Sequence, residues 1–450
     1  MAPSLPSSVA VVVAGGGPAG FMAAIAAAEA GVRDVHILEA TPEPLQKVRI
    51  SGGGRCNVTH ACWDPRTLAG HYPRGSRPLR GPFSQFAAGD TVAWFADHGL
   101  ELVEEPDGRL FPRANRSSAV IEVLRRAAAA AGVSLHPGLA LRQAEALQSG
   151  GFRLGLRLAG SAPPTGASGG GMCCERLVLA PGSHPSGRRL AAQLGHAIVP
   201  PVPSLFSLAL EGGELAALAG LALDPVELEL ELGLELPGGA GSAAAGQRFR
   251  QRGAVLITHW GLSGPATLRL TAFAARALHE RSYRGELRVA WAGGLDRARV
   301  EELLTRARLD QARRQLATWR PWPELPRRLW LHLLDQAGLA GEQRWADLSR
   351  TGQRTLTERL CGSRYALRGR GPFGEEFVTA GGVPLGEVNL GTMESRRCPG
   401  LQVVGELLDV DGVTGGFNFQ HCWTSGYLAG QALADFFKDR EHRQVHRQQN

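Results

Sequence analysis

Three glycines near the start of the chain have the spacing of a dinucleotide-binding turn. They follow an apolar run, Val9 to Ala14, and precede an Ala-rich helical stretch that reaches about Ala30. In such a turn the first glycine permits the bend, the second lets a pyrophosphate approach the backbone, and the third allows close packing of helix on strand. The residues that we assign to this turn are Gly15, Gly17, Pro18, Ala19 and Gly20.

An acid follows these glycines at the distance expected for ribose binding. Glu39 ends a predicted second strand, Val35 to Glu39, nineteen residues after Gly20. The N-terminus of the intervening helix offers amides and partial positive charge to phosphates, and the acid can accept a hydrogen bond from a ribose 2′-hydroxyl. We therefore expect dinucleotide binding here, because a merely glycine-rich turn would not require the strand, the helix and the acid together.

A second glycine-rich segment, flanked by cations, follows the acid. Three consecutive glycines can bring backbone amides and a fixed charge against a phosphate or the edge of a flavin ring. The alternative is a flexible surface loop with incidental arginines, but the position directly after Glu39 favours a cofactor contact. The candidate residues are Lys47, Ser51, Gly52, Gly53, Gly54, Arg55 and Asn57.

The surrounding pattern predicts an α/β fold: a doubly wound, Rossmann-like FAD-binding domain split by an inserted β-rich plus helical domain. Strand, helix and strand over the first 39 residues form one βαβ unit, and its sheet should be parallel. From Val226 to Leu236, Glu alternates with Leu or Val, a pattern typical of half-buried antiparallel strands. The predicted parts are the first FAD-domain part (1–198), the β-rich insert (199–296), its helical part (297–362) and the second FAD-domain part (363–450).

Five segments resemble one known family in the order in which that family has them. They are GGGPAGFMAA, KVRISGGGRCNVTH, LFPRANRSSAVIEVL, THWGLSGPATL and GELLDVDGVTGGFNFQHCWTSGYLAG. The family is the BaiN/RdsA-type (YhiN-like) family of NAD(P)/FAD-dependent oxidoreductases. The resemblance spans nearly the whole chain and implies non-covalent FAD, reduction by NADH or NADPH, and a bacterial cytosolic origin.

Three later turns complete the expected flavin site. Leu179 to Gly182 resembles the Ala-Thr-Gly strand end of FAD enzymes, but Pro181 replaces the threonine and removes a donor, which indicates a divergent subfamily. A strand closes near the expected ribityl contact, and a helix then begins whose N-terminus could stabilise the anionic N1/O2 edge of reduced flavin. The candidates are Gly182, Gly405, Glu406, Gly415, Gly416, Phe417 and Asn418.

Two residues are candidates for delivering a proton while flavin N5 delivers hydride. Cys56 and His259 lie in the two motifs that we expect closest to the isoalloxazine. The alternatives are that Cys56 packs as a small residue in a tight loop and that His259 makes structural hydrogen bonds. The spacing from Cys56 to Cys62 is not that of a redox cysteine pair, so a dithiol relay is disfavoured.

The composition and the N-terminal residues indicate where the protein is located and how many domains it has. No apolar run approaches the ~20 residues that span a bilayer, and Met1 to Ser8 lack the basic region of a signal peptide. The seven cysteines form no CxxC pair and no zinc-site spacing, which predicts reduced thiols and no metal. We therefore expect a cytoplasmic protein of 450 residues with two or three domains.

One basic segment suggests a nucleic-acid partner. Between Arg281 and Trp330, twelve arginines face six acids, and four tryptophans are interleaved with them. Cations and aromatic faces suit RNA phosphates and unstacked bases. The alternative is a solvated helical surface with ordinary core tryptophans. The four residues are Trp291, Trp319, Trp322 and Trp330.

Together these features predict an FAD enzyme that takes hydride from NADH or NADPH and reduces an activated carbon-carbon double bond. The substrate would be a uridine in ribosomal RNA, giving dihydrouridine, or a small conjugated enone. We find no second dinucleotide fold for the nicotinamide, which we expect to bind transiently over the flavin. Two other classes remain open: a non-catalytic flavin-containing RNA-binding or assembly protein, and an FAD-dependent oxygenase.

Overall fold

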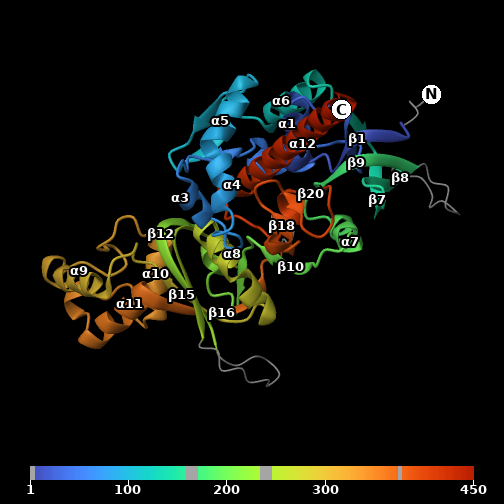
Figure 1. The fold of residues 1–450 in the computed structure, drawn as a ribbon. Coiled ribbons are helices and arrows are strands. Elements are labelled where there is room, and N and C mark those ends of the chain that lie inside the picture. The colour runs from blue at the N-terminus through green and yellow to red at the C-terminus, as the bar shows by residue number, and fades with distance from the viewer. Residues whose placement is uncertain (1–5, 159–170, 234–245, 373–377, 450) are drawn as a thin grey trace. The chain divides into compact units, whose positions relative to one another are not determined.

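The structure is a computed structural model that describes residues 6–158, 171–233, 246–372 and 378–449. The chain divides into two compact units (Figure 1). Unit 1 comprises Met1–Pro201 and Val378–Asn450, and unit 2 comprises Val202–Phe377. Both ends of the sequence therefore contribute to unit 1, and unit 2 is an insertion.

Unit 1 is built on a sheet whose central strands are parallel. The strand order is β18-β19-β20-β9-β1-β2-β6, and a hairpin of β7 and β8 pairs with β9. Val11, Val12 and Val13 of β1 are fully buried, as expected for a strand with parallel neighbours on both sides. The bounds are β1 Ser8–Ala14, β2 Val35–Glu39, β6 Ser134–Pro137, β7 Leu139–Ala146, β8 Phe152–Leu158, β9 Gly171–Leu179, β18 Val388–Asn389, β19 Glu394–Ser395 and β20 Leu401–Val403.

Two helices from opposite ends of the sequence pack against each other in unit 1 (Figure 1). These are α1 (Pro18–Glu29) and α12 (Phe417–Gln449). A Cβ atom on Gly426 would lie 2.5 Å from the Ala19 carbonyl oxygen, and one on Gly430 would lie 2.6 Å from Ala26 Cβ. Because only glycine fits at both contacts, the two backbones can approach closely, which holds the C-terminal helix against the helix of the dinucleotide turn.

Shorter elements of unit 1 surround this pair. Strands β3, β5 and β4 form a small sheet, and β10 pairs with β17. The helices are α2 Gln46–Gly54, α3 Pro65–Gly70, α4 Arg80–Gln85, α5 Ala88–Asp97, α6 Ser117–Ala130 and α7 Pro185–Gln193. The remaining bounds are β3 Thr59–His60, β4 Leu102–Glu104, β5 Arg109–Pro112, β10 Val199–Ser204, β17 Val378–Gly382, η3 Leu385–Glu387 and η4 Gly405–Leu407.

Unit 2 contains a closed barrel with the strand order β11-β14-β13-β12-β15-β16. In β12 the leucines at 228, 230 and 232 are fully buried, while the intervening glutamates face arginines of β13 and β15. The predicted alternation is therefore confirmed as far as residue 232; residues 234–236 lie outside the described residues. The bounds are β11 Leu208–Leu210, β12 Ala222–Leu232, β13 Gln247–Ile257, β14 Gly261–Ser263, β15 Glu286–Ala290 and β16 Ser363–Arg370.

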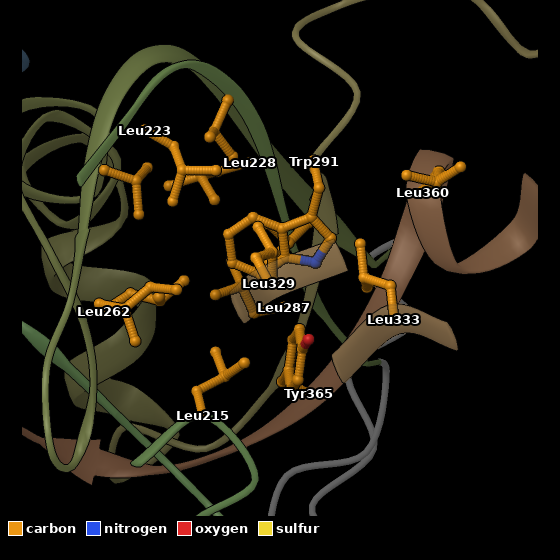
Figure 2. Packing of buried hydrophobic residues seen from close by; sticks show 14 of the residues in the cluster. Leu215, Leu223, Leu228, Leu262, Leu287, Trp291, Leu329, Leu333, Leu360 and Tyr365 are labelled. Atoms are coloured by element: carbon orange, nitrogen blue, oxygen red, sulfur yellow. The ribbon is translucent and has the colours of Figure 1, made fainter. Parts of the chain in front are cut away.

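The helices of unit 2 share one hydrophobic core with the barrel. Figure 2 shows Leu329 and Leu333 of α10 packing with Trp291 and the barrel residue Leu287. The helices are α8 Pro265–Glu280, α9 Arg297–Asp310, α10 Arg327–Gln336 and α11 Arg350–Gly362. Our sequence boundary at 362/363 separated β16 from the barrel, whereas its pairing with β11 and β15 assigns it there. The prediction of a doubly wound α/β domain split by a β-rich and helical insertion is confirmed.

The interleaved tryptophans of unit 2 are core residues. Trp291 and Trp330 are buried, and Trp319 and Trp322 pack against the same hydrophobic cluster. Trp330 Nε1 also donates a hydrogen bond to the Leu316 carbonyl at 2.7 Å. The enclosed rings of Trp291 and Trp330 cannot stack on an unstacked base, so the core alternative holds for these two residues. Trp319 and Trp322 are only partly buried, and both alternatives stay open for them.

Candidate functional site

The dinucleotide turn has two glycines that packing requires and one that faces open space. Gly15 has a φ of +123°, and a Cβ atom there would lie 2.1 Å from the Ala180 carbonyl oxygen. A Cβ atom on Gly20 would lie 1.9 Å from the Gly15 carbonyl oxygen. By contrast, a Cβ atom on Gly17, the N-cap of α1, would meet nothing within 4 Å. Protein packing therefore does not require a glycine at 17, whereas close approach of a phosphate would.

Glu39 lies at the end of β2 directly beside this turn. Its Oε2 accepts a hydrogen bond from the Gly16 amide at 2.7 Å, and its Oε1 accepts from the amide and the hydroxyl of Thr41, each at 2.7 Å. Each carboxylate oxygen has two lone pairs, so Oε2 keeps one free for a further donor. The acid is thus held rigidly and can still accept from a ribose hydroxyl.

Three predicted residues from distant segments meet around one ion pair. Lys47 Nζ lies 2.6 Å from Glu406 Oε2, and a Cβ atom on Gly182 would lie 3.5 Å from the same oxygen. Ser183, which we did not predict, accepts a hydrogen bond from Lys47 at 3.2 Å. The fold therefore brings the segments around residues 47, 182 and 406 to one place.

The Gly405 turn links this ion pair to the dinucleotide turn. Gly405 has a φ of +65°, and a Cβ atom there would lie 2.9 Å from Ala19 Cβ. Its amide donates a hydrogen bond to Ser425 Oγ in α12 at 3.0 Å. A continuous series of contacts therefore connects Glu39, the turn before α1, and the segment containing Glu406.

The glycine triplet forms a turn of left-handed backbone at the end of α2. Gly52, Gly53 and Gly54 have φ values of +56°, +67° and +84°, and Cβ atoms on the last two would meet nothing within 4 Å. Ser51 Oγ donates a hydrogen bond to the Val48 carbonyl at 2.8 Å, which stabilises the start of the turn. Among the described residues, no hydrogen bond reaches the buried Asn57 Oδ1.

Arg55 is less available than predicted. Its Nη1 lies 2.6 Å from Glu105 Oε1, and its guanidinium carbon lies 4.0 Å from the centre of the Phe111 ring. The side chain is therefore paired and stacked within the protein. Binding a phosphate would require it to share or leave Glu105.

The turn before α12 is fixed by side chains that we had predicted as cofactor contacts. Gly416 has a φ of +93°, and a Cβ atom there would lie 2.7 Å from the Thr59 backbone. The Asn418 amide both accepts from Gly412 N at 2.8 Å and donates to Gly412 O at 2.9 Å. The Phe417 ring is buried, with His71 stacked on it at a centroid distance of 4.2 Å. A cofactor contact of the buried Phe417 would therefore use the main chain, whereas Asn418 keeps one N–H and one oxygen lone pair for a further partner.

The segment that precedes this turn is anchored by a buried ion pair. Arg74 makes two hydrogen bonds to Asp411 through Nε and Nη2. The Val413 amide donates to the His71 carbonyl at 2.9 Å. The Gly415–Gly416 turn at the N-terminus of α12 thus has little freedom to move.

The two predicted catalytic residues lie in different units. Cys56 in unit 1 has a fully buried side chain, and burial raises the pKa of its thiol to about 12. His259 in unit 2 is exposed and lines a hollow of about 10 Å³ with Glu211 and Tyr365. A hollow of that size holds at most one water molecule. A thiol with so high a pKa is a weak proton donor at pH 7. The assignments of Cys56 and His259 both stay predictions.

Two histidines near the site were not predicted from the sequence. His60 is half-buried, and a Cβ atom on Gly415 would lie 3.3 Å from its Cδ2. His60 lies 4.8 Å from the Phe417 ring, centre to centre. His421 is buried in α12, one turn after Phe417. Both residues belong to quoted motifs, but their spacing gave no sign that the chain would bring them together.

The described residues offer no membrane span or metal centre of their own. No helix in the described ranges is long and apolar enough to cross a membrane. No group of three or more His, Cys, Asp or Glu side chains in the same ranges is arranged to hold a metal ion. All seven cysteines are free thiols.

Comparisons with known proteins match nearly the whole chain. The 3-dehydro-bile acid delta(4,6)-reductase of Clostridium scindens is 31% identical over 440 residues, which cover 94% of this chain and 98% of that protein. The ribosomal RNA dihydrouridine synthase of Escherichia coli is 28% identical over 443 residues, which cover 94% of this chain and 97% of that protein. A flavocytochrome c3 fumarate reductase structure is 16% identical, covers 96% of this chain and 79% of its own, and has a TM-score of 0.47. The HI0933-like protein Rossmann domain matches residues 9–432, so the chain belongs to the HI0933-like Rossmann family.

Proposed function

We propose that the protein is an FAD-dependent oxidoreductase that reduces an activated carbon-carbon double bond. The observation that carries the proposal is the series of contacts in unit 1 that joins Glu39, the turn before α1 and the Lys47–Glu406 ion pair, which we call the cradle. A Cβ atom added to Gly17, Gly53 or Gly54 would have no protein atom within 4 Å, so these glycines face unfilled space. The donors and acceptors along this cradle suit a molecule with a ribose, a pyrophosphate and a polar ring edge.

The residues of unit 1 would bind and orient the cofactor. When bound, FAD supplies a ring system that accepts a hydride and passes it on. Glu39 would accept from the adenosine ribose, and the amides at the start of α1 would bind the pyrophosphate. The N-terminus of α12 favours negative charge beside it, so the pyrimidine edge would lie at the Gly415–Gly416 turn. We propose NADH or NADPH as the reductant, bound only transiently.

The substrate that we favour is a small molecule whose double bond is conjugated to a carbonyl. The relative with 31% identity is named as a reductase of 3-dehydro-bile acids. The relative from Escherichia coli is named as a dihydrouridine synthase, and the uracil double bond that it would reduce is also conjugated to a carbonyl. Trp291 and Trp330 of unit 2 are buried and cannot stack on bases, which weakens one reason for preferring RNA.

As the proton donor we propose His60 in place of Cys56 and His259. His60 is half-buried beside the Gly415 turn, whereas Cys56 is fully enclosed. Partial burial lowers the pKa of His60, and the nearby Asp107 and Glu104 offset part of that effect. A His60→Gln variant should lower the rate of substrate-dependent flavin reoxidation while leaving reduction by NAD(P)H unchanged. Equal reoxidation rates in Cys56→Ala would remove Cys56 from the mechanism.

The proposal is tested by following the flavin in the purified protein under anaerobic conditions. We expect NADH or NADPH to bleach the bound flavin, and a panel of conjugated enones to restore its colour. In parallel, nucleoside mass spectrometry of ribosomal RNA from a parent and a deletion strain would reveal any dihydrouridine that depends on the gene. Reoxidation by an enone with unchanged RNA supports the small-molecule substrate, and loss of dihydrouridine supports the RNA.

The same experiment separates the other classes. A flavin that neither nucleotide reduces would favour a non-catalytic RNA-binding or assembly protein. Substrate-stimulated oxygen consumption with a hydroxylated product would favour an oxygenase. We also propose a cytoplasmic location, because seven free thiols suit a reducing compartment and NAD(P)H is available there.

A further inference from the structure

One pocket of unit 1 has no residue in common with the cradle. It lies between α4 and the segment that contains η3 and β18 (Figure 1), and its volume is about 410 Å³. Small-molecule sites typically enclose roughly 300 to 1,000 Å³. None of the residues that line this pocket was predicted as a cofactor contact. The pocket is therefore large enough for a ligand other than FAD.

Two glycines contribute to this space. Gly81 of α4 and Gly386 of η3 both line the pocket, and a Cβ atom on either would meet nothing within 4 Å. Neither residue has the positive φ that favours glycine. Neither the backbone nor the protein packing therefore requires a glycine at these positions, whereas room for a ligand would.

Arg396 is the charged residue of the pocket, and no acid lines it. Its Nε donates a hydrogen bond to the Val388 carbonyl at 3.3 Å. Within the described residues its two terminal nitrogens make no ion pair or hydrogen bond. The nearest acids in sequence, Glu387 and Glu394, form ion pairs with other residues. The guanidinium is therefore available to an anion in the pocket.

Two side-chain amides add hydrogen-bond donors to the pocket. A Cβ atom on Gly391 would lie 4.0 Å from Gln85 Nε2 and 3.5 Å from Asn389 Oδ1, so both amides reach the same place. Asn389 Oδ1 accepts a hydrogen bond from the Gly391 amide at 3.2 Å, which leaves the two N–H groups of Asn389 for another acceptor. The apolar lining residues are Pro78, Pro82, Leu385, Val388 and Leu390. The pocket thus suits a molecule with an apolar body and an anionic group.

One wall of the pocket is fixed by contacts within the protein. β18 pairs with β19, and the Arg396 amide donates to the Glu387 carbonyl at 2.8 Å. In addition, the buried His196 bridges two residues of this wall, with Nδ1 2.9 Å from Glu387 Oε2 and Nε2 2.8 Å from Ser395 Oγ. A ligand would bind without having to order this segment, which lowers the entropic cost of binding.

We propose that this pocket binds a small organic anion, a carboxylate or sulfonate carried on an apolar body. Arg396 receives the anionic group, because a guanidinium can donate two parallel hydrogen bonds to such a group. The apolar body lies against Pro82, Leu385 and Leu390. The inference goes beyond the proposed function and does not require FAD in the cradle.

The test uses two fluorescent probes of similar shape that differ in charge. Anilinonaphthalene sulfonate carries an anionic group, and N-phenylnaphthylamine is its neutral counterpart. Both are titrated into the full-length protein, as purified and again with saturating FAD. We expect saturable binding of the sulfonate probe that FAD does not displace, because the pocket and the cradle share no residue.

Two substitutions address the charge and the space of the pocket separately. Arg396→Gln should weaken the sulfonate probe at least 5-fold and leave the neutral probe within about 2-fold. Gly386→Phe should weaken both probes at least 10-fold, because the added ring occupies space that the apolar body needs. If Gly386→Phe does not fold, Gly81→Phe narrows the pocket from α4, and the same 10-fold criterion applies.

Each substitution has a matched control. Arg397→Gln removes the same charge one residue away, where the guanidinium lies 3.3 Å from Glu387 Oε1 and does not line the pocket. Gly89→Phe adds the same ring in α5, where a Cβ atom also meets nothing within 4 Å. Both controls should bind the two probes within about 2-fold of the wild type.

Three results would overturn the inference. The first is a wild type without saturable binding of the sulfonate probe, and the second is release of this probe by FAD, which would place it in the cradle. The third is an equal loss in Arg396→Gln and Arg397→Gln, or an equal affinity in Gly386→Phe and Gly89→Phe, because the probe would then bind elsewhere. A protein that binds the probe in the pocket but does not bind FAD would refute the proposed function and leave this inference standing.

Discussion

The buried ion pair between Arg74 and Asp411 should be among the most sensitive points of unit 1. The Asp411 side chain is fully buried and that of Arg74 is 10% exposed. An Asp411→Ala substitution would leave a guanidinium that stays charged at any practical pH in a largely dry site. Removing one partner of a buried pair typically costs about 3 to 5 kcal/mol. We expect a loss of that size in the free energy of unfolding.

The measurement is urea unfolding of the full chain at pH 7, followed by tryptophan fluorescence, with an exposed pair as control. Arg364 and Glu286 are 68% and 45% exposed in their side chains, so Glu286→Ala should cost no more than about 1 kcal/mol. A double variant, Arg74→Met with Asp411→Leu, should regain most of the loss because no charge is left buried. A loss below about 1 kcal/mol in Asp411→Ala would refute the reasoning, since it would mean that water or another group compensates Arg74.

Three further predictions concern FAD binding in the cradle, the stability of the protein at acidic pH, and RNA binding by the insert. Gly17→Ala should weaken FAD binding with little change in stability. Gly20→Ala should destabilise the apoprotein, because its Cβ would lie 1.9 Å from a carbonyl oxygen. Urea titrations and FAD-binding measurements on both variants check this. The folded pKa of His421, about 4, lies below its unfolded value of ~6.5. The unfolded state therefore binds more protons, so the free energy of unfolding should decrease as the pH falls from about 6.5 towards 4, at up to about 1.4 kcal/mol per pH unit. His421→Leu should flatten this dependence, and an unchanged slope would contradict it. Trp330→Phe should lower the stability of unit 2 through the lost hydrogen bond to Leu316 without changing RNA binding in a filter assay, and weaker RNA binding at full stability would revive the stacking role.

Local patterns predicted the dinucleotide turn because its requirements lie within a few residues. Gly15 and Gly20 are needed for contacts with Ala180 and with each other, and the spacing reports those contacts directly. The meeting of Lys47 with Glu406 joins residues 359 positions apart. Both residues were predicted separately as cofactor contacts, but nothing in the sequence predicted their contact, since neither residue carries a local signal for the other.

Sequence reasoning was less reliable about what a side chain does once it is in place. Asn418 lies at the predicted turn, but its side-chain amide already makes two hydrogen bonds to Gly412. Arg55 lies in the predicted loop, but Glu105 neutralises it. The type of a residue shows which bonds it can form, whereas the fold determines which partner lies next to it.

The insert shows why composition alone was ambiguous about the substrate. An excess of arginine can bind phosphates only where those arginines lack acids beside them, yet Arg284, Arg297 and Arg299 all lie against glutamates. Paired surface charges of this kind contribute little net field at physiological salt. The tryptophans are likewise used by the core that joins the barrel to its helices. Arg313, Arg314 and Arg327 of the same segment are exposed, so a contact with phosphates stays a prediction for them. The two dihydrouridine synthases also favour RNA, whereas the bile-acid reductase is the more similar in sequence. Both kinds of substrate would have a double bond conjugated to a carbonyl. The enone panel and the RNA analysis distinguish a small molecule from RNA.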